Sequence, residues 1–155
     1  MNNSADKNPV ARFTAKWQTL ERVYEEYAKA QGLTYMSFTV LTVIYEQDGC
    51  CTQKLICEKS LYTKQSVNAI IKAFWQQGYV QLREEAADRR NKRIVFTAKG
   101  RAYAEAVVGR FSAVEQEAMA YLTDEQWRLL LEMAATFEEH FVAGVGRLLR
   151  EAEDK

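Results

Sequence analysis

Four cationic side chains fall within five consecutive positions, just before a short apolar run: Arg89, Arg90, Lys92 and Arg93. Guanidinium and ammonium groups at this density could neutralise the phosphates of a polyanion or enter a narrow minor groove of DNA. A solvated loop with incidental charge is the weaker alternative, because so many bases share so few positions. The stretch therefore predicts an anion-binding loop, and the elements beside it should indicate what that loop serves.

The charge of the chain is unevenly distributed although it sums to zero, with 21 Lys or Arg and 21 Asp or Glu in 155 residues. Residues 52–101 contain eleven bases and four acids, a net charge of +7. The other residues contain ten bases and seventeen acids, a net charge of −7. A basic middle between acidic ends favours contact between the middle and a polyanion such as nucleic acid.

The residues before the basic stretch have the pattern of a helix-turn-helix. Thr52 is suited to cap a short helix over 53–59, residues 60–62 form a tight connection, and Thr63 is suited to cap a helix that runs to Gly78. The second helix has an apolar face, made of Val67, Ile70, Ile71 and Phe74. Its opposite face has no acid and consists of Gln65, Asn68, Ala69, Lys72 and Gln76. Amides and lysines read base edges and phosphates in a major groove, so this helix is predicted to be a recognition helix.

The basic stretch lies between two runs with strand-like alternation, 79–84 and 93–97. Two short strands joined by a polar loop over 85–92 form a hairpin whose tip projects. A hairpin directly after a helix-turn-helix is a wing. The cations at its tip would then lie beside the groove next to the one that the recognition helix enters.

The ends of the chain predict long amphipathic helices. Asn8 and Pro9 open a helix over 8–31 with a narrow apolar seam, which suits packing against another helix, although an ordinary core helix stays an alternative. A second apolar segment, 35–45, stops at Asp48 and Gly49. After Thr97 the pattern turns helical again, with an apolar face of Ala104, Val107, Val108, Phe111 and Val114. A capping box at 123–126 starts a last helix whose apolar residues are Trp127, Leu130, Leu131, Ala134, Phe137, Phe141, Val145 and Leu148. One winged domain cannot bury three such helices, so a homodimer is predicted.

The residues of the predicted wing resemble the signature of the MarR-type winged helix-turn-helix regulators, Asp-x-Arg followed by two strand hydrophobes, Thr and Gly. The matching positions are Asp88, Arg90, Ile94, Phe96, Thr97 and Gly100. Upstream, the segments 52–54, 64–67 and 78–80 fit the family's helix-turn-helix in register. The resemblance is strong over 52–100 and topological elsewhere. Phe96, Cys57 and Ser60 depart from the usual pattern.

The resemblance implies a mainly α fold with a small β-hairpin wing, in a single domain over 1–155. Residues 8–31 and 101–150 would form the dimerisation helices and 35–100 the DNA-binding region. The DNA contacts carried over from the family fall on Lys64, Gln65, Ser66, Asn68, Lys72, Arg89, Arg90 and Lys92. Asp88 would orient a wing arginine, since a carboxylate facing phosphate would repel it. The implied function is a repressor, or less often an activator, which binds a pseudo-palindromic operator in double-stranded DNA and is released by a small ligand.

The family places its effector between the interface helices and the wing domain, where this chain would offer Trp17, Tyr35, Phe38 and Phe111. Aromatic side chains suit a planar aromatic ligand. The same residues are explained equally well as core.

Two other functions stay open from the sequence. Cys50, Cys51 and Cys57 could make a thiol- or soft-metal-responsive regulator, although buried inert cysteine is the commoner state. Alternatively, the winged helix has lost DNA binding and the dimer is an interaction module.

Several classes of protein are disfavoured. Catalytic triads, zinc spacings and cofactor motifs are missing from the sequence, so we expect neither an enzyme nor a cofactor. Neither a secretory leader nor a run of about 18 apolar residues occurs, so we expect a cytoplasmic protein without a membrane segment. Three cysteines, two of them adjacent, do not indicate a disulfide framework.

Overall fold

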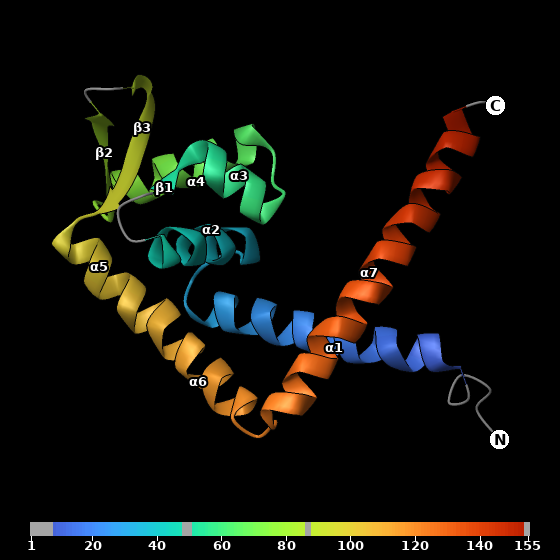
Figure 1. Cartoon of the computed structure of the whole chain (residues 1–155). Coiled ribbons are helices and arrows are strands. Elements are labelled where there is room, and N and C mark those ends of the chain that lie inside the picture. The colour runs from blue at the N-terminus through green and yellow to red at the C-terminus, as the bar shows by residue number, and fades with distance from the viewer. Residues whose placement is uncertain (1–7, 48–50, 86–87, 154–155) are drawn as a thin grey trace. The chain divides into compact units, whose positions relative to one another are not determined.

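Helices and a small antiparallel sheet make up the chain, as the computed structural model of residues 8–47, 51–85 and 88–153 shows (Figure 1). The elements are, in order, α1 (Pro9–Ala30), α2 (Tyr35–Glu46), β1 (Cys51–Thr52), α3 (Gln53–Ser60), α4 (Lys64–Gln76), β2 (Val80–Glu85), β3 (Asp88–Phe96), α5 (Ala98–Ala104), the π-helical turn η2 (Glu105–Gly109), α6 (Arg110–Met119) and α7 (Asp124–Glu153). This mainly helical architecture with a hairpin confirms the predicted fold class. The chain divides after Arg110 into two compact units. The single domain over 1–155 stays a prediction.

Side-chain caps start the helices, and all of them except the cap at Thr34 lie at positions that the sequence predicts. The oxygens of Asn8, Thr34, Thr52, Thr63 and Thr97 each accept a hydrogen bond from a backbone N–H in the first turn. In front of α7 the capping box is reciprocal, because Thr123 N donates to Gln126 Oε1 (2.9 Å) and Gln126 N donates to Thr123 Oγ1 (3.2 Å). Each cap satisfies donors that would otherwise lack a partner at the helix end, which fixes where the helix begins.

The core of the first unit is built around α2, which buries Phe38, Val40, Leu41, Val43 and Ile44. Side chains from the helix-turn-helix, the sheet and the following helix complete it: Ile56, Val67, Ile71, Phe74, Val80, Ile94, Ala104, Val107 and Val108. The helix α1 contributes only Ala28 as a buried residue. Its apolar seam therefore stays largely exposed within the first unit.

The sheet has the order β1-β3-β2, and all its pairs are antiparallel. The sequence did not predict β1, whose two residues pair with β3 so that Cys51 lies opposite Ile94. The prediction of a loop over 85–92 is also wrong in its extent, because β3 already begins at Asp88. The prediction relied on the alternation of apolar and polar residues. Polar residues can form the backbone hydrogen bonds of a strand without such alternation, so the polar start of β3 was not recognised.

A close backbone contact joins the hairpin to α5. Thr97 N donates to Tyr79 O (3.0 Å), and the Thr97 hydroxyl donates to Gly78 O (2.6 Å). At Gly100 a Cβ would lie 1.8 Å from Tyr79 O, so only glycine fits there. The Thr-x-x-Gly part of the wing signature is thus a packing requirement of this junction.

The turn between α3 and α4 contains a residue in the left-handed region, Leu61 with φ 59°. Ser60 supports this turn, since its Oγ donates to Ile56 O (2.7 Å) and accepts from Tyr62 N (3.3 Å). The polar residue at this position, a departure from the family pattern, therefore stabilises the connection.

Candidate nucleic-acid interface

The helix α4 presents the polar face that the sequence predicts. Val67, Ile71 and Phe74 are buried, whereas five residues on the other side are exposed: Gln65, Asn68, Ala69, Lys72 and Gln76. Because α4 carries no acidic residue, this face can approach phosphates without repulsion. Contact between this face and DNA remains a prediction.

The start of α4 is held in place by the preceding helix. Gln53, the first residue of α3, donates from Nε2 to Lys64 O (3.1 Å). Ser66 is half-buried, and its hydroxyl lies 2.9 Å from Thr63 Oγ1, which also accepts from Ser66 N (3.2 Å). Lys64 and Gln65 are exposed. The positive end of the helix dipole at this point favours an anion.

A groove of about 260 Å³ runs between α4 and the sheet. It brings together Asn68 of the recognition helix and Lys92 of the wing, two residues that the sequence predicts as DNA contacts from separate elements. Its other lining residues are Thr52, Gln53, Ile71, Leu82 and Ile94. The helix and the hairpin thus share one mixed polar and apolar surface.

The wing has more charge pairing than the sequence suggests. Lys92 Nζ lies 3.2 Å from Glu84 Oε1, and both side chains are at least half exposed. Cross-strand pairing sets Arg83 directly opposite Arg93. Arg83 was not predicted as a wing cation, because only the strand register places it beside Arg93. The side chains of Asp88, Arg89 and Arg90 lie outside the described part of the chain.

A second cavity, of about 270 Å³, lies between α1, α2 and α3 in the first unit. It is lined by two of the four predicted effector residues, Tyr35 and Phe38, although Phe38 is almost fully buried and also serves the core. Trp17 does not line this cavity and is 62% exposed on α1, and Phe111 belongs to the second unit.

Several lining residues of this cavity were not predicted from the sequence: Tyr24, Thr39, Thr42, Val43, Glu46 and Lys59. Tyr24 packs edge-on against Tyr35, with ring centroids 6.3 Å apart. Burial raises the pKa of Tyr35, and the neighbouring Tyr62 and Glu21 act in the same direction. The spacing of Tyr24 on the seam of α1 was visible, but its partner across the cavity was not.

The cysteines do not form a reactive cluster among the described residues. Cys51 is fully buried, and burial raises the pKa of its thiol to about 12, against a smaller opposing effect of Lys59. Cys57 is half-buried, and Cys50 lies outside the described residues. No group of three or more His, Cys, Asp or Glu side chains in the described ranges could hold a metal ion. A neutral, buried thiol is a poor nucleophile, which opposes a sensing role for Cys51.

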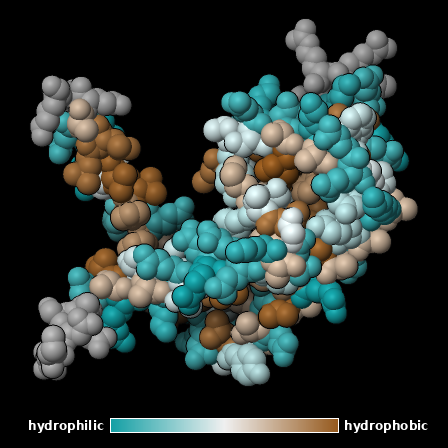
Figure 2. Space-filling model, turned by 180° about the vertical axis from the view of Figure 1, so that it is seen from behind, coloured by the Kyte–Doolittle hydropathy of each residue, from teal (hydrophilic) through white to brown (hydrophobic). Residues whose placement is uncertain are grey.

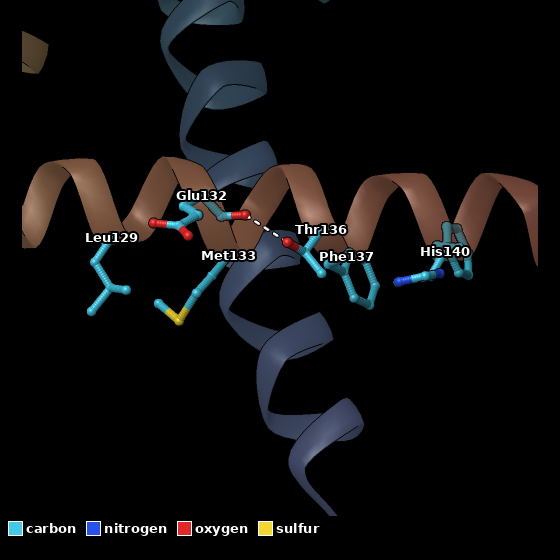
Figure 3. Close-up of a pocket in the computed structure, with 7 residues that line it drawn as sticks. Leu129, Glu132, Met133, Thr136, Phe137 and His140 are labelled. Atoms are coloured by element: carbon cyan, nitrogen blue, oxygen red, sulfur yellow. Dashed lines mark hydrogen bonds between the residues drawn. The ribbon is translucent and has the colours of Figure 1, made fainter.

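The second unit exposes apolar side chains instead of burying them. Figure 2 shows hydrophobic side chains gathered on the surface of α7. Leu129, Met133 and Phe137 project to one side of the helix (Figure 3). These three residues line a groove on α7, together with Glu132, Thr136, His140 and Phe141. No helix in the described ranges is long and apolar enough to cross a membrane.

Comparison with known proteins gives a consistent result. Residues 31–91 match a family model described as MarR family. NMB1585, a MarR family regulator from Neisseria meningitidis, is 24% identical, with 90% of this chain and 98% of that one covered and a TM-score of 0.75. MepR from Staphylococcus aureus in its DNA-binding conformation is 20% identical, with 88% and 98% covered and a TM-score of 0.68. The transcriptional regulator SlyA is 21% identical, with 86% and 94% covered and a TM-score of 0.64. Among curated proteins none matches this sequence.

The two kinds of match concern different parts of the chain. The family model covers the helix-turn-helix and the start of the wing, and the solved structures share the fold along nearly the whole length. The resemblance that the wing signature indicated is thereby confirmed. Residues 31–91 thus carry the winged helix-turn-helix of the MarR family, whose members are DNA-binding transcriptional regulators and not enzymes.

Proposed function

We propose that two copies of the chain form a homodimer that binds a pseudo-palindromic operator and represses transcription in the cytoplasm until a small aromatic effector releases it. The observation that carries this proposal is the acid-free exposed face of α4, which shares a groove with Lys92 of the wing. A solvated helix would normally mix acidic side chains into such a face. MepR, which has the same fold, is described in a DNA-binding conformation, and this supports the DNA-binding part of the proposal.

Within the interface the residues have different roles. Gln65 and Asn68 carry amides that pair with base edges, so they would determine sequence preference. Lys64, Lys72, Lys92, Arg89 and Arg90 would neutralise phosphates, which sets affinity and its dependence on salt. Ser66 would contact DNA only by sharing its hydroxyl with Thr63, and Asp88 would orient a wing arginine.

The homodimer is supported by apolar surface that each unit leaves exposed. On α1 the exposed apolar residues are Val10, Phe13, Trp17, Leu20 and Val23, and the first four belong to the seam. On α7 the exposed apolar residues include Leu130, Phe137, Phe141, Val145 and Leu148. Soluble monomers rarely leave contiguous apolar faces of this kind in water. A two-fold dimer presents two copies of α4, so its operator should contain half-sites about 34–36 Å apart.

The effector would occupy the cavity that Tyr35 and Phe38 line. Its volume of about 270 Å³ suits a single planar ring, and Tyr24 and Tyr35 provide aromatic walls. We expect Tyr35→Ala to retain DNA binding but to lose release by aromatic acids or phenols. Screening such compounds by thermal shift, then by release of labelled operator, tests this step separately from DNA binding.

The central experiment is selection of bound fragments from genomic DNA, followed by fluorescence anisotropy on the selected site at several salt concentrations. With about 6–10 phosphates neutralised, affinity falls by about three to five decades between 50 and 200 mM salt. Lys72→Ala should reduce the slope of log K against log salt by about 1, whereas Gln65→Ala should change sequence preference at an unchanged slope.

Lys29→Ala is the matched control, because this exposed lysine lies on α1 and not on α4. It should behave as the wild type. The proposal would be refuted if the wild-type protein selected no DNA sequence, or if its affinity for DNA did not change with salt concentration.

A further inference from the structure

One uninterrupted helical run, α5–η2–α6, carries the chain from the first unit into the second. Its central five residues form the π-helical turn η2, in which Arg110 N donates to Glu105 O, five residues earlier. A π-turn adds a residue to the helix and is a recognised cause of bends. The direction in which α6 continues therefore depends on how η2 is held.

A tyrosine from α1 holds the backbone of η2. The hydroxyl of Tyr27 donates to Val107 O at 2.7 Å, although the two residues are 80 positions apart in sequence. The Val107 side chain is buried, so this turn is part of the core of the first unit.

A second tyrosine, from α2, holds the first residue of η2. The hydroxyl of Tyr45 donates to Glu105 Oε2 at 2.6 Å. The end of the turn makes room for this pair, because a Cβ at Gly109 would lie 2.7 Å from Glu105 Oε1 and 3.0 Å from the Tyr45 hydroxyl. Two hydroxyls from two helices thus hold the first residue and the middle residue of the π-turn.

We propose that Tyr27, Tyr45 and Glu105 are positioning residues that fix the direction in which α6 leaves the winged-helix unit, and that they thereby set the half-site separation the protein prefers. This inference rests on the proposed function, since it requires a dimer that reads two half-sites. None of the three residues needs to touch DNA.

The geometry gives the size of the expected effect. Ten residues of α6 span about 15 Å at about 1.5 Å per residue. A change in bend of about 20° moves the far end of such a helix by about 5 Å. Base pairs are about 3.4 Å apart, so this displacement corresponds to one or two base pairs of operator spacing.

The test uses the purified full-length protein and a series of operators in which the spacer between two copies of the selected half-site changes by one base pair at a time. Wild-type protein should show one preferred spacer. In Tyr27→Phe and Tyr45→Phe the preferred spacer should shift by one or two base pairs, or its advantage over neighbouring spacers should fall by about fivefold. Affinity for an isolated half-site should not change, because α4 and the wing are untouched.

Two controls separate positioning from general damage. Tyr62→Phe also removes a tyrosine hydroxyl from the first unit, where it donates to Thr39 Oγ1 (3.4 Å), and should keep the wild-type spacer profile. Glu105→Gln retains an acceptor oxygen for Tyr45 and should also keep the profile, whereas Glu105→Ala should not.

Hydrogen exchange gives a readout without DNA. Amides in 105–113 should exchange faster in Tyr27→Phe and Tyr45→Phe than in Tyr62→Phe. An unchanged spacer profile together with unchanged exchange in both variants overturns this inference alone. If the wild type selects no half-site, the proposed function fails. Faster exchange in the two variants would then support only the conclusion that Tyr27 and Tyr45 stabilise η2, and not an effect on operator spacing.

Discussion

Gly100 gives the sharpest stability prediction, because its replacement by alanine has one structural consequence. The new Cβ would lie 1.8 Å from Tyr79 O and 2.6 Å from Tyr79 C, both backbone atoms that no rotamer change can move away. Reaching even a 3.0 Å contact requires α5 and the start of β2 to separate by at least 1.2 Å. That separation breaks the bond from Thr97 N to Tyr79 O, now 3.0 Å long.

The expected cost combines two effects. Overpacking costs about 1–3 kcal/mol, and a backbone group left without its partner costs about 1–3 kcal/mol. We therefore expect Gly100→Ala to lower the free energy of unfolding by about 2–6 kcal/mol. With an m value of about 2 kcal/mol/M, the midpoint of urea unfolding falls by about 1–3 M.

Urea unfolding followed by circular dichroism measures this effect, at equal protein concentration because a dimer is stabilised by mass action. Gly146→Ala is the matched control: its Cβ would meet only Arg150 Nη1, at 3.6 Å, within α7. A helix-interior glycine replaced by alanine should gain about 0.5–1 kcal/mol. A Gly100→Ala midpoint equal to that of the wild type would refute the close contact and the packing explanation of the wing signature.

Three further predictions concern other sites. Leu61→Asn should raise the free energy of unfolding by about 0.5–1 kcal/mol in the same urea assay. Leu61 is 88% exposed and has φ 59°, a backbone conformation that asparagine adopts more easily than leucine. A lower midpoint would contradict the idea that the backbone is strained at Leu61. Glu84→Gln should tighten DNA binding by a factor of about 2–5 at low salt, because it releases Lys92 for phosphate; equal affinity by anisotropy would count against a role for Lys92. With the other two cysteines replaced by serine, Cys51 should react with a thiol reagent much more slowly in native protein than in urea. Since its pKa is raised to about 12 from 9.0, the contribution of Cys51 to stability should be complete below about pH 9 and be lost as pH rises towards 12, which urea titrations across that range can measure.

Local signals made the helices predictable. Thr52, Thr63 and Thr97 could be identified as caps because a hydroxyl before an apolar periodic run satisfies a specific N–H of the next turn. The division of α4 into buried Val67 and exposed Lys72 also followed from spacing alone, since helical periodicity fixes which residues share a face.

Features that depend on non-local contact were not predictable. The strand β1 is two residues long and exists because Cys51 meets Ile94 across the sheet, 43 positions later in sequence. The residues of the π-turn η2 would suit an ordinary α-helix. The turn is held instead by Tyr27 and Tyr45, which belong to other helices. Its location becomes visible only when the partners of Val107 O and Glu105 are known.

The candidate effector cavity shows the same division. Tyr35 and Phe38 are close in sequence and lie in one cavity, whereas Trp17 and Phe111 were chosen for chemistry alone. The aromatic type of Trp17 could not indicate whether it points into the first unit, because a narrow seam on α1 suits either a core or a partner helix. Its exposure favours the partner helix.

The register of the hairpin gives the wing a property that residue counting could not reveal. Arg83 lies directly opposite Arg93, and like charges at opposed positions destabilise an antiparallel pair by up to about 1 kcal/mol. We expect an anion beside the two guanidinium groups to offset such repulsion, so that a DNA phosphate bound there would stabilise the hairpin. Since any ligand that binds only the folded state stabilises it, DNA binding and wing stability become linked quantities. The hairpin should therefore gain more protection from DNA than the buried core around α2, which is stable without it.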